Sequence, residues 1–334
     1  MRMEATSGEN PFVIKREQAL RIKVTDKCPW RCSFCHSEGS RDIIDLDWGP
    51  EIQEIIAAFQ KALPEIKEVH FTGGEPTKNP ELATIAAGLA AMGLEVKTTS
   101  NGQFSEEELE RLFAAGLRSF NFSVHSVDPQ EFLSTQEGRG VSRKGGKRRL
   151  PTLSWAHAQV EQELKSVLRA KEIGAAVKIN TVVSTAEDAG RVSKIIEWAR
   201  EHQIPLRLLN DLGNGMESIL AIRKILKDMG AVEVLRKANP GSSSCSTIYR
   251  LPNGYEIGFK QIRDLKLASM CSQCPRATDG TCEEQFYGIR LERRPDRKYQ
   301  VRLCLQEENE QTTMDVEEFL HSDALQEIQS LIRD

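Results

Sequence analysis

Several features are missing from this sequence of 334 residues, and each absence excludes a class of protein. No stretch approaches the roughly 18 consecutive apolar residues of a membrane span, so we do not expect a membrane protein. The N-terminal segment lacks the apolar core of a secretory signal peptide, which predicts a cytoplasmic protein. The chain has no basic excess either, and its net charge of −4 and pI of about 6.0 disfavour general nucleic-acid binding.

Cysteine is almost absent from the central part of the chain and is concentrated toward its two ends. Cys28, Cys32 and Cys35 form one group, and no cysteine occurs between Cys35 and Cys245. The second group has four members, which are Cys271, Cys274, Cys282 and Cys304. Since cytosolic thiols stay reduced, we expect metal or redox chemistry from them and not disulfides. The distribution predicts two separate sites.

Strand-like and helix-like patterns alternate through the first two thirds of the chain. The expected strands cover residues 20–25, 68–72, 94–98, 120–124, 177–183 and 206–209. Six repeats of strand and helix predict an α/β fold with a parallel sheet, a partial (β/α)6 TIM-like barrel. The chemistry of such folds lies at the C-terminal ends of the strands.

The alternation ends near residue 210, where we expect a domain boundary. Residues 1–210 then form the barrel, and residues 211–334 form a smaller domain that ends in an amphipathic helix at 316–332. Within the barrel, the segment 138–150 interrupts the pattern with six basic residues and four glycines. It is either a solvated loop or a clamp for phosphates and other acidic groups.

The first three cysteines form a C-x3-C-x2-C motif directly after the first expected strand. Three thiolates can bind three irons of a [4Fe–4S] cluster and leave the fourth iron without a protein ligand. A zinc site with His36 as a further ligand, or three unrelated thiols, are the alternatives that the spacing leaves open.

Two further features accompany this motif, and together they resemble the radical S-adenosylmethionine (SAM) superfamily. Phe34 precedes the last cysteine, and Gly73-Gly74-Glu75-Pro76 follows the second strand. The resemblance implies that Cys28, Cys32 and Cys35 hold a [4Fe–4S] cluster and that SAM binds its open iron. It also implies that SAM is cleaved to a 5′-deoxyadenosyl radical, which takes a hydrogen atom from the substrate. A one-electron reductant such as flavodoxin or ferredoxin is the expected partner.

The same resemblance implies SAM contacts at the ends of successive strands. They are Phe34, Gly73, Gly74, Glu75, Pro76, Thr99, Ser100 and Asn101. Ser123, His125 and Asn180 are polar positions on the next strands, and they either contact the cofactor or substrate or serve as structural polar groups.

Most of the chain is also similar to the GTP 3′,8-cyclase family of molybdenum-cofactor biosynthesis. The similarity is carried by residues 20–28, 123–129 and 178–183, and it implies that Arg21 contacts a phosphate. Glu68 and His70 stand where that family has basic residues, and the chain ends without the family's Gly-Gly tail. We therefore expect GTP to be a poor substrate, because a carboxylate repels phosphates.

The expected function is a radical rearrangement, cyclisation or epimerisation of a nucleotide or other small phosphorylated metabolite. The first alternative is a maturase that modifies a ribosomally made peptide, although only 19 residues precede the first strand here. The second alternative is a non-catalytic iron–sulfur or zinc protein, which would have no use for the Gly-Gly-Glu-Pro turn.

The second cysteine group follows the order of the cyclase family's second cluster, with one addition. Cys271, Cys274 and Cys304 match that order, and an insert of about sixteen residues adds Cys282. This resembles the twitch and SPASM auxiliary domains and implies a second [4Fe–4S] cluster with four cysteine ligands. A structural zinc is one alternative. The other is Cys245 in place of Cys282, from a segment at 241–246 that reads as a flexible loop.

Overall fold

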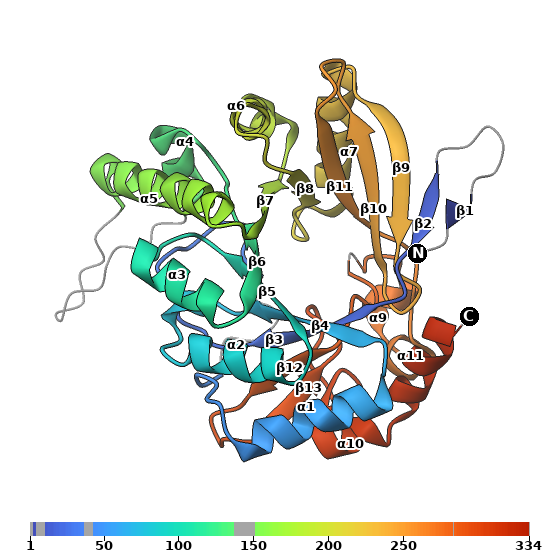
Figure 1. The fold of residues 1–334 in the computed structure, drawn as a ribbon. Coiled ribbons are helices and arrows are strands. Elements are labelled where there is room, and N and C mark those ends of the chain that lie inside the picture. The colour runs from blue at the N-terminus through green and yellow to red at the C-terminus, as the bar shows by residue number, and fades with distance from the viewer. Residues whose placement is uncertain (1–2, 5–10, 37–42, 137–150, 283, 334) are drawn as a thin grey trace.

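The structure, a computed structural model, describes residues 3–4, 11–36, 43–136, 151–282 and 284–333. The basic segment at 138–150 lies outside these residues. A single curved sheet of fourteen strands runs through the molecule (Figure 1). Within the described ranges, none of the helices combines the length and apolarity that a membrane crossing requires.

Six parallel strands form the centre of the sheet, and their order along the chain is their order in space. They are β3 (Gln18–Lys23), β4 (Ile66–Thr72), β5 (Glu95–Ser100), β6 (Leu117–Phe122), β7 (Ala176–Val183) and β8 (Leu206–Asn210). Apolar side chains of these strands, such as Ile22, Phe71 and Ile179, are fully buried in the core. The α/β fold predicted from the sequence, a partial TIM-like barrel, is confirmed.

Helices follow these strands and cover the outer side of the sheet (Figure 1). They are α1 (Pro50–Ala62), α2 (Leu82–Ala91), α3 (Glu106–Ala114), α4 (Pro129–Ser134), α5 (Leu153–Glu172), α6 (Ala189–Glu201) and α7 (Gly215–Asp228), with short 3-10 turns η2 (Pro76–Lys78) and η3 (Ala186–Asp188). Local signals start several of them. Ser105 caps α3 by accepting the Glu108 backbone N–H at 3.2 Å, and Thr152 caps α5 in the same way.

The last third of the chain, together with two short N-terminal strands, extends this sheet at both edges. On the β8 side lie β11 (Glu256–Ile262), β10 (Ser244–Arg250), β9 (Val232–Ala238), β2 (Phe12–Ile14) and β1 (Met3–Glu4), and on the β3 side lie β12 (Arg290–Arg293), β13 (Tyr299–Arg302) and β14 (Thr313–Asp315). Both joints are parallel: β11 pairs with β8, and β12 pairs with β3. The sheet therefore runs through residue 210, and the division into two domains there stays a prediction.

Two sequence-based expectations for this part are wrong. Cys245 lies in β10, paired with Ala238 and Gln261, and not in a flexible loop. Small serines make 241–246 read as a turn, but pairing on both sides overrides that local preference. The single helix expected at 316–332 is two helices, α10 (Val316–Leu320) and α11 (Asp323–Arg333).

The break between those helices has a local cause. The Ser322 hydroxyl accepts the Leu325 backbone N–H at 3.2 Å and so starts α11 afresh. Of two further short helices, α8 (Ala268–Cys271) ends at the first cysteine of the C-terminal group, and α9 (Pro275–Thr278) begins directly after Cys274. The backbone N–H groups of Ala268 and Ser269 bond to Glu327 of α11, which ties this segment to the end of the chain.

Candidate active site

The carboxyl ends of the barrel strands open into one large cavity with a volume of about 1520 Å³. The barrel supplies one wall, and β9 to β11 with the segment before β12 supply the other. Of the residues predicted from the sequence, those that line it are Arg21, Cys28, Cys32, Phe34, Cys35, Gly73, Gly74, Glu75, Thr99, Ser100, Asn101, Ser123, His125 and Asn180. Among the described residues, Pro76 and the four C-terminal cysteines are not part of this lining.

The loop that carries the first three cysteines is anchored by an aromatic side chain. Trp30 is buried, packs edge-to-face on Phe132 of α4 with ring centroids 4.9 Å apart, and donates its indole N–H to Gln159 of α5 at 2.8 Å. Gln136 places its amide nitrogen 3.6 Å from the sulfur of Cys32. Packing and hydrogen bonds from α4 and α5 thus hold the cysteine loop against the end of the barrel.

The two glycines after β4 allow that turn to lie directly on the chain leading to the cysteines. A Cβ atom on Gly73 would lie 2.3 Å from the carbonyl oxygen of Thr25, and one on Gly74 would lie 2.4 Å from that of Lys27. Gly74 and Glu75 donate their backbone N–H groups to those same two carbonyls at 2.8 and 2.7 Å. Only glycine fits this close approach, since any side chain would meet backbone atoms.

The carboxylate of Glu75 is fully buried and links the segment after β4 to the end of β5. One oxygen accepts the hydroxyls of Thr77 and Ser100 at 2.8 and 2.7 Å, and the other accepts the Asn101 backbone N–H at 2.6 Å. Burial raises the pKa of Glu75, and these donors oppose that rise. Asn101 also brings its amide nitrogen to 3.9 Å from the sulfur of Cys28, so this network reaches the cysteine loop.

His125, which follows β6, is buried against the aromatic residue of the cysteine motif. Its ring lies edge-on to Phe34 with centroids 4.6 Å apart, and its Nδ1 lies 3.4 Å from the backbone nitrogen of Val182. Burial, reinforced by the positive charge of Arg191, lowers the pKa of His125 to about 3. The imidazole is therefore neutral at physiological pH and accepts the Val182 N–H. Nearby Ser123 is half-buried at the cavity wall.

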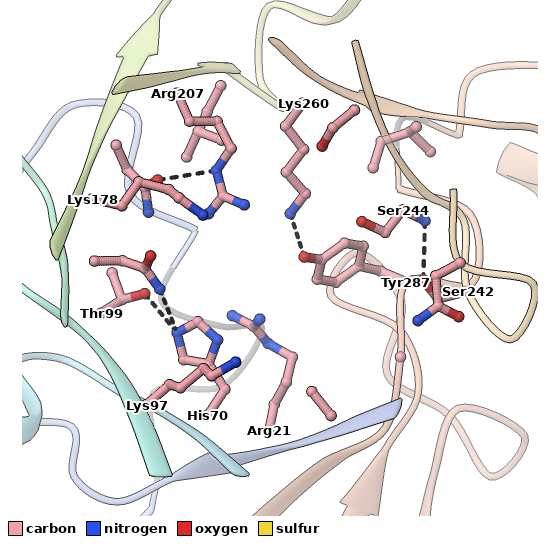
Figure 2. Close-up of a pocket in the computed structure, with 18 of the residues that line it drawn as sticks. Arg21, His70, Lys97, Thr99, Lys178, Arg207, Ser242, Ser244, Lys260 and Tyr287 are labelled. Atoms are coloured by element: carbon pink, nitrogen blue, oxygen red, sulfur yellow. Dashed lines mark hydrogen bonds between the residues drawn. The ribbon is translucent and has the colours of Figure 1, made fainter. Parts of the chain in front are cut away.

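Sequence reasoning missed a group of cations that face the same cavity. Lys178 of β7, Arg207 of β8 and Lys260 of β11 point into it together with Arg21 of β3 (Figure 2). Asn180 orients Arg207 by accepting its Nε–H at 3.0 Å. Among the described residues, no carboxylate forms an ion pair with Lys178 or Arg207.

The pKa values of these lysines are lowered by burial and, after it, by neighbouring positive charge. Burial, followed by the charge of Arg207, lowers the pKa of Lys178 to about 8. Burial also lowers the pKa of Lys260 to about 8. Strand alternation is the signal that would have found one of them, because Lys178 lies two residues before Asn180 and so shares its face of β7.

The charge environment of Glu68 also differs from what the sequence alone predicts. An uncompensated carboxylate would repel phosphates, but Glu68 forms ion pairs with Lys15 and, at 2.7 Å, with Lys97 of β5. Burial raises the pKa of Glu68, yet the two lysines outweigh burial and the pKa is lowered. A hydrogen bond of 2.8 Å joins Nε2 of His70 to the hydroxyl of Thr99. Lys97, 29 residues from Glu68 in sequence, thus cancels the charge on which the predicted repulsion depends.

The C-terminal cysteines gather beside the second wall of the cavity. The thiols of Cys271, Cys274 and Cys282 are close enough to interact electrostatically, and Cys282 interacts in the same way with Cys304. The neighbours of Cys245 are instead Arg236, Arg263 and Glu233. Cys282 therefore lies near Cys271 and Cys304, whereas charged side chains surround Cys245.

Backbone N–H groups point at two of these sulfurs. Gln285 donates to Cys282 at 3.3 Å, and Glu307 donates to Cys304 at 3.4 Å. Hydrogen bonds of this kind surround the cysteine ligands of iron–sulfur clusters and tune them. In the described part of the chain, no three His, Cys, Asp or Glu side chains converge closely enough to hold a single metal ion.

Comparisons with known proteins agree with this arrangement of motifs. Residues 22–199, more than half of the chain, match the family model of the Radical SAM superfamily. The GTP 3′,8-cyclase of Tolumonas auensis is 29% identical over 209 residues, 60% of this chain and 55% of that protein. The GTP 3′,8-cyclase of Mannheimia succiniciproducens is 30% identical over 206 residues, 59% and 54% of the two chains. The matched part is thus little more than half the length of these two relatives.

Other relatives align over a longer range, at lower identity. The probable GTP 3′,8-cyclase of Thermococcus kodakarensis is 25% identical over 264 residues, 77% of this chain and 80% of that protein. Among solved structures, SuiB of Streptococcus suis covers 93% of this chain and 65% of its own, with a TM-score of 0.53 and 14% identity. SuiB bound to the precursor peptide SuiA gives a TM-score of 0.54 over 93% and 64% of the chains, also at 14% identity. At this identity the likeness shows the fold alone.

Proposed function

This chain belongs to the radical SAM superfamily, and on that premise we propose that its substrate is a small anionic metabolite, a nucleotide or another phosphorylated molecule. The family implies an enzyme with a [4Fe–4S] cluster and SAM. The observation that carries the proposal is the group of cations in the cavity: Arg21, Lys178, Arg207 and Lys260 face the space beside the cysteine loop.

The physical basis is charge balance. Burial first, and the charge of Arg207 after it, lower the pKa values of Lys178 and Lys260, so both effects raise the free energy of the charged lysines in the empty cavity. An anion placed among them removes the repulsion and forms charge-assisted hydrogen bonds with arginine and lysine. A phosphate group fits this chemistry better than a neutral or cationic group.

The residues of the first motif suit the cofactors of the family. Cys28, Cys32 and Cys35 offer three thiolates in one loop, and the close-packed turn at 73–76 holds that loop in place. When bound, the cluster and SAM supply a carbon-centred radical that removes a hydrogen atom from the substrate. The chain's own work is to bind and orient: the cations hold the anionic end of the substrate.

A second [4Fe–4S] cluster is proposed for the C-terminal cysteines, with Cys282 as the fourth ligand. Its support is the grouping of Cys271, Cys274, Cys282 and Cys304 and the N–H groups directed at two of the sulfurs. Four cysteines close the cluster to substrate, so its role would be electron transfer or support of the cavity wall. The electrons would come from a one-electron donor such as flavodoxin or ferredoxin.

Modification of a ribosomally made peptide is the second candidate. Its support is the fold shared with SuiB, which has been solved with the precursor peptide SuiA. The concentration of cations in the cavity favours the phosphorylated metabolite over a peptide, unless that peptide were strongly acidic.

The proposal is tested by anaerobic equilibrium dialysis of the reconstituted protein against a panel of nucleoside mono- and triphosphates, with GTP included. We expect at least one nucleotide to bind. The double variant K178M/R207M should bind that nucleotide at least tenfold more weakly, while SAM cleavage without substrate continues. The matched control K224M removes an exposed lysine on α7. Equal nucleotide binding by the double variant and the wild type would exclude the proposed site.

A further inference from the structure

Tyr287 stands inside the group of cations, on the segment that runs from Cys282 to β12. The Lys260 ammonium lies 3.7 Å from the centre of its ring and also donates a hydrogen bond to its hydroxyl. The Arg21 guanidinium lies 5.4 Å from the same ring centre, and that of Arg290 lies 5.7 Å away. Figure 2 shows the phenol oxygen directed at Lys260, with Arg21 on the barrel side of the ring.

The charges around this phenol come from four strands and one loop. Lys260 belongs to β11, Arg21 to β3 and Arg207 to β8, and all three favour the ionised phenol electrostatically. Arg290 of β12 is paired with the buried carboxylate of Glu284 at 2.7 Å, so this loop residue neutralises it. The phenol oxygen is therefore placed to balance the charge of Lys260, to which it is hydrogen-bonded.

We propose that the Tyr287 phenolate is an internal counter-ion of the cavity, and that a phosphate group of the substrate displaces it from Lys260. This inference rests on the proposed anionic substrate. It goes further, because it assigns a role to Tyr287 and a free-energy cost to substrate binding. The phosphate takes over the ammonium of Lys260 and the guanidinium groups of Arg21 and Arg207. The displaced phenolate then takes one proton from solvent, since its stabilising cation has gone.

Two opposing influences on Tyr287 agree with this geometry. Burial raises the pKa of Tyr287, but Lys260, Arg21 and Arg207 outweigh burial and lower it to about 7. The other tyrosines behave differently, because burial raises the pKa of Tyr249, Tyr255 and Tyr299. Between pH 7 and pH 8 the resting pair is thus mainly an ammonium and a phenolate in contact.

The proton taken up at Tyr287 predicts how phosphate affinity changes with pH. Each bound phosphate requires one proton to be taken up at Tyr287, and no other bond is made or broken. Below pH 7 the phenol is already protonated and binding has no such cost. Above pH 7, phosphate affinity should fall by up to tenfold for each pH unit, because one proton must be supplied from an ever lower concentration.

The test observes Tyr287 directly. The reconstituted protein, with oxidised clusters, is labelled with ¹³C at the ζ carbon of tyrosine, and the chain has only four tyrosines. The variant Y287F identifies the signal of Tyr287, and Y249F serves as the matched control. We expect the Tyr287 signal to titrate near pH 7 while the other three stay protonated. At pH 7.5, saturating inorganic pyrophosphate should move that signal to the protonated position.

A second variant tests whether the Lys260 ammonium lowers the pKa of Tyr287. K260Q keeps a polar side chain but removes the ammonium, so Tyr287 should titrate at a higher pH than in the wild type. Pyrophosphate that binds, by equilibrium dialysis, without moving the Tyr287 signal would overturn the counter-ion and leave the proposed anion site standing. A Tyr287 signal that stays protonated up to pH 9 would overturn it as well. Absence of pyrophosphate binding would overturn both.

Discussion

Two groups of residues in the cavity differ in how they are balanced before any ligand arrives. Among the SAM-family motifs, polar groups satisfy one another: Glu75 accepts hydrogen bonds from Thr77, Ser100 and Asn101. In the group of cations, Arg207 repels both Lys178 and Lys260. The first group is preorganised, whereas the second is relieved of this repulsion when an anion binds. A cofactor shared by a superfamily and a substrate peculiar to one enzyme are thus recognised by different physical means.

The largest expected effect is the loss of SAM cleavage. Changing Cys28, Cys32 and Cys35 together to alanine should remove about four irons of about eight and abolish SAM cleavage, because three thiolates hold the open cluster. Iron analysis and measurement of 5′-deoxyadenosine after anaerobic reconstitution check this. SAM cleavage that survives the triple change would contradict the assignment of the site.

The second effect separates the two cysteine groups. C282A should lose the second cluster, about four irons, while SAM cleavage at the first cluster persists, because a closed cluster needs all four thiolates. C245A is the matched control and should keep its full iron content, since Cys245 lies in β10 away from the group. If C245A loses iron and C282A does not, the fourth ligand has been misassigned.

A third, smaller effect concerns how much the Glu75 hydrogen-bond network contributes to the stability of the fold. E75Q keeps the shape of the side chain but turns an acceptor for four donor groups into a group with its own N–H donors. We expect a loss of about 3 kcal/mol in the free energy of unfolding, since a buried charge-assisted network is broken. Chemical denaturation measures it, with the exposed E81Q as the reference. Equal stability of the two variants would show that the network contributes nothing.

The smallest effect concerns pH. The folded protein keeps His125 neutral down to a pKa of about 3, whereas the unfolded chain protonates it near its ordinary value. The unfolded state thus binds more protons below about pH 6.5, and stability falls with decreasing pH. Between pH 6.5 and 4.5 the wild type should lose about 2 kcal/mol more stability than H125Q. Denaturation at both pH values checks this, with H157Q as the control, and parallel pH profiles would refute it.

Contiguous motifs and alternating strands were predictable from the sequence, whereas charge pairing across the sheet was not. Cys28 to Cys35 and Gly73 to Pro76 are local patterns whose chemistry follows from their spacing. Glu68 was predictable as a carboxylate, but its neutralisation by Lys97 depends on the pairing of β4 with β5. Tyr287 meets Lys260 only because β11 and β12 extend opposite edges of one sheet. Contacts between residues distant in sequence leave no signal in a single chain.

Strand β12 has a consequence for how the protein is made. It lies beside β3, pairing Arg290 with Arg21 and Leu291 with Ile22, although almost the whole chain separates the two strands. During synthesis the first barrel strand therefore keeps an unpaired edge until the last segment leaves the ribosome. So distant a contact is also slow to form once the chain is complete. We expect the nascent protein to depend on chaperones that shield this edge.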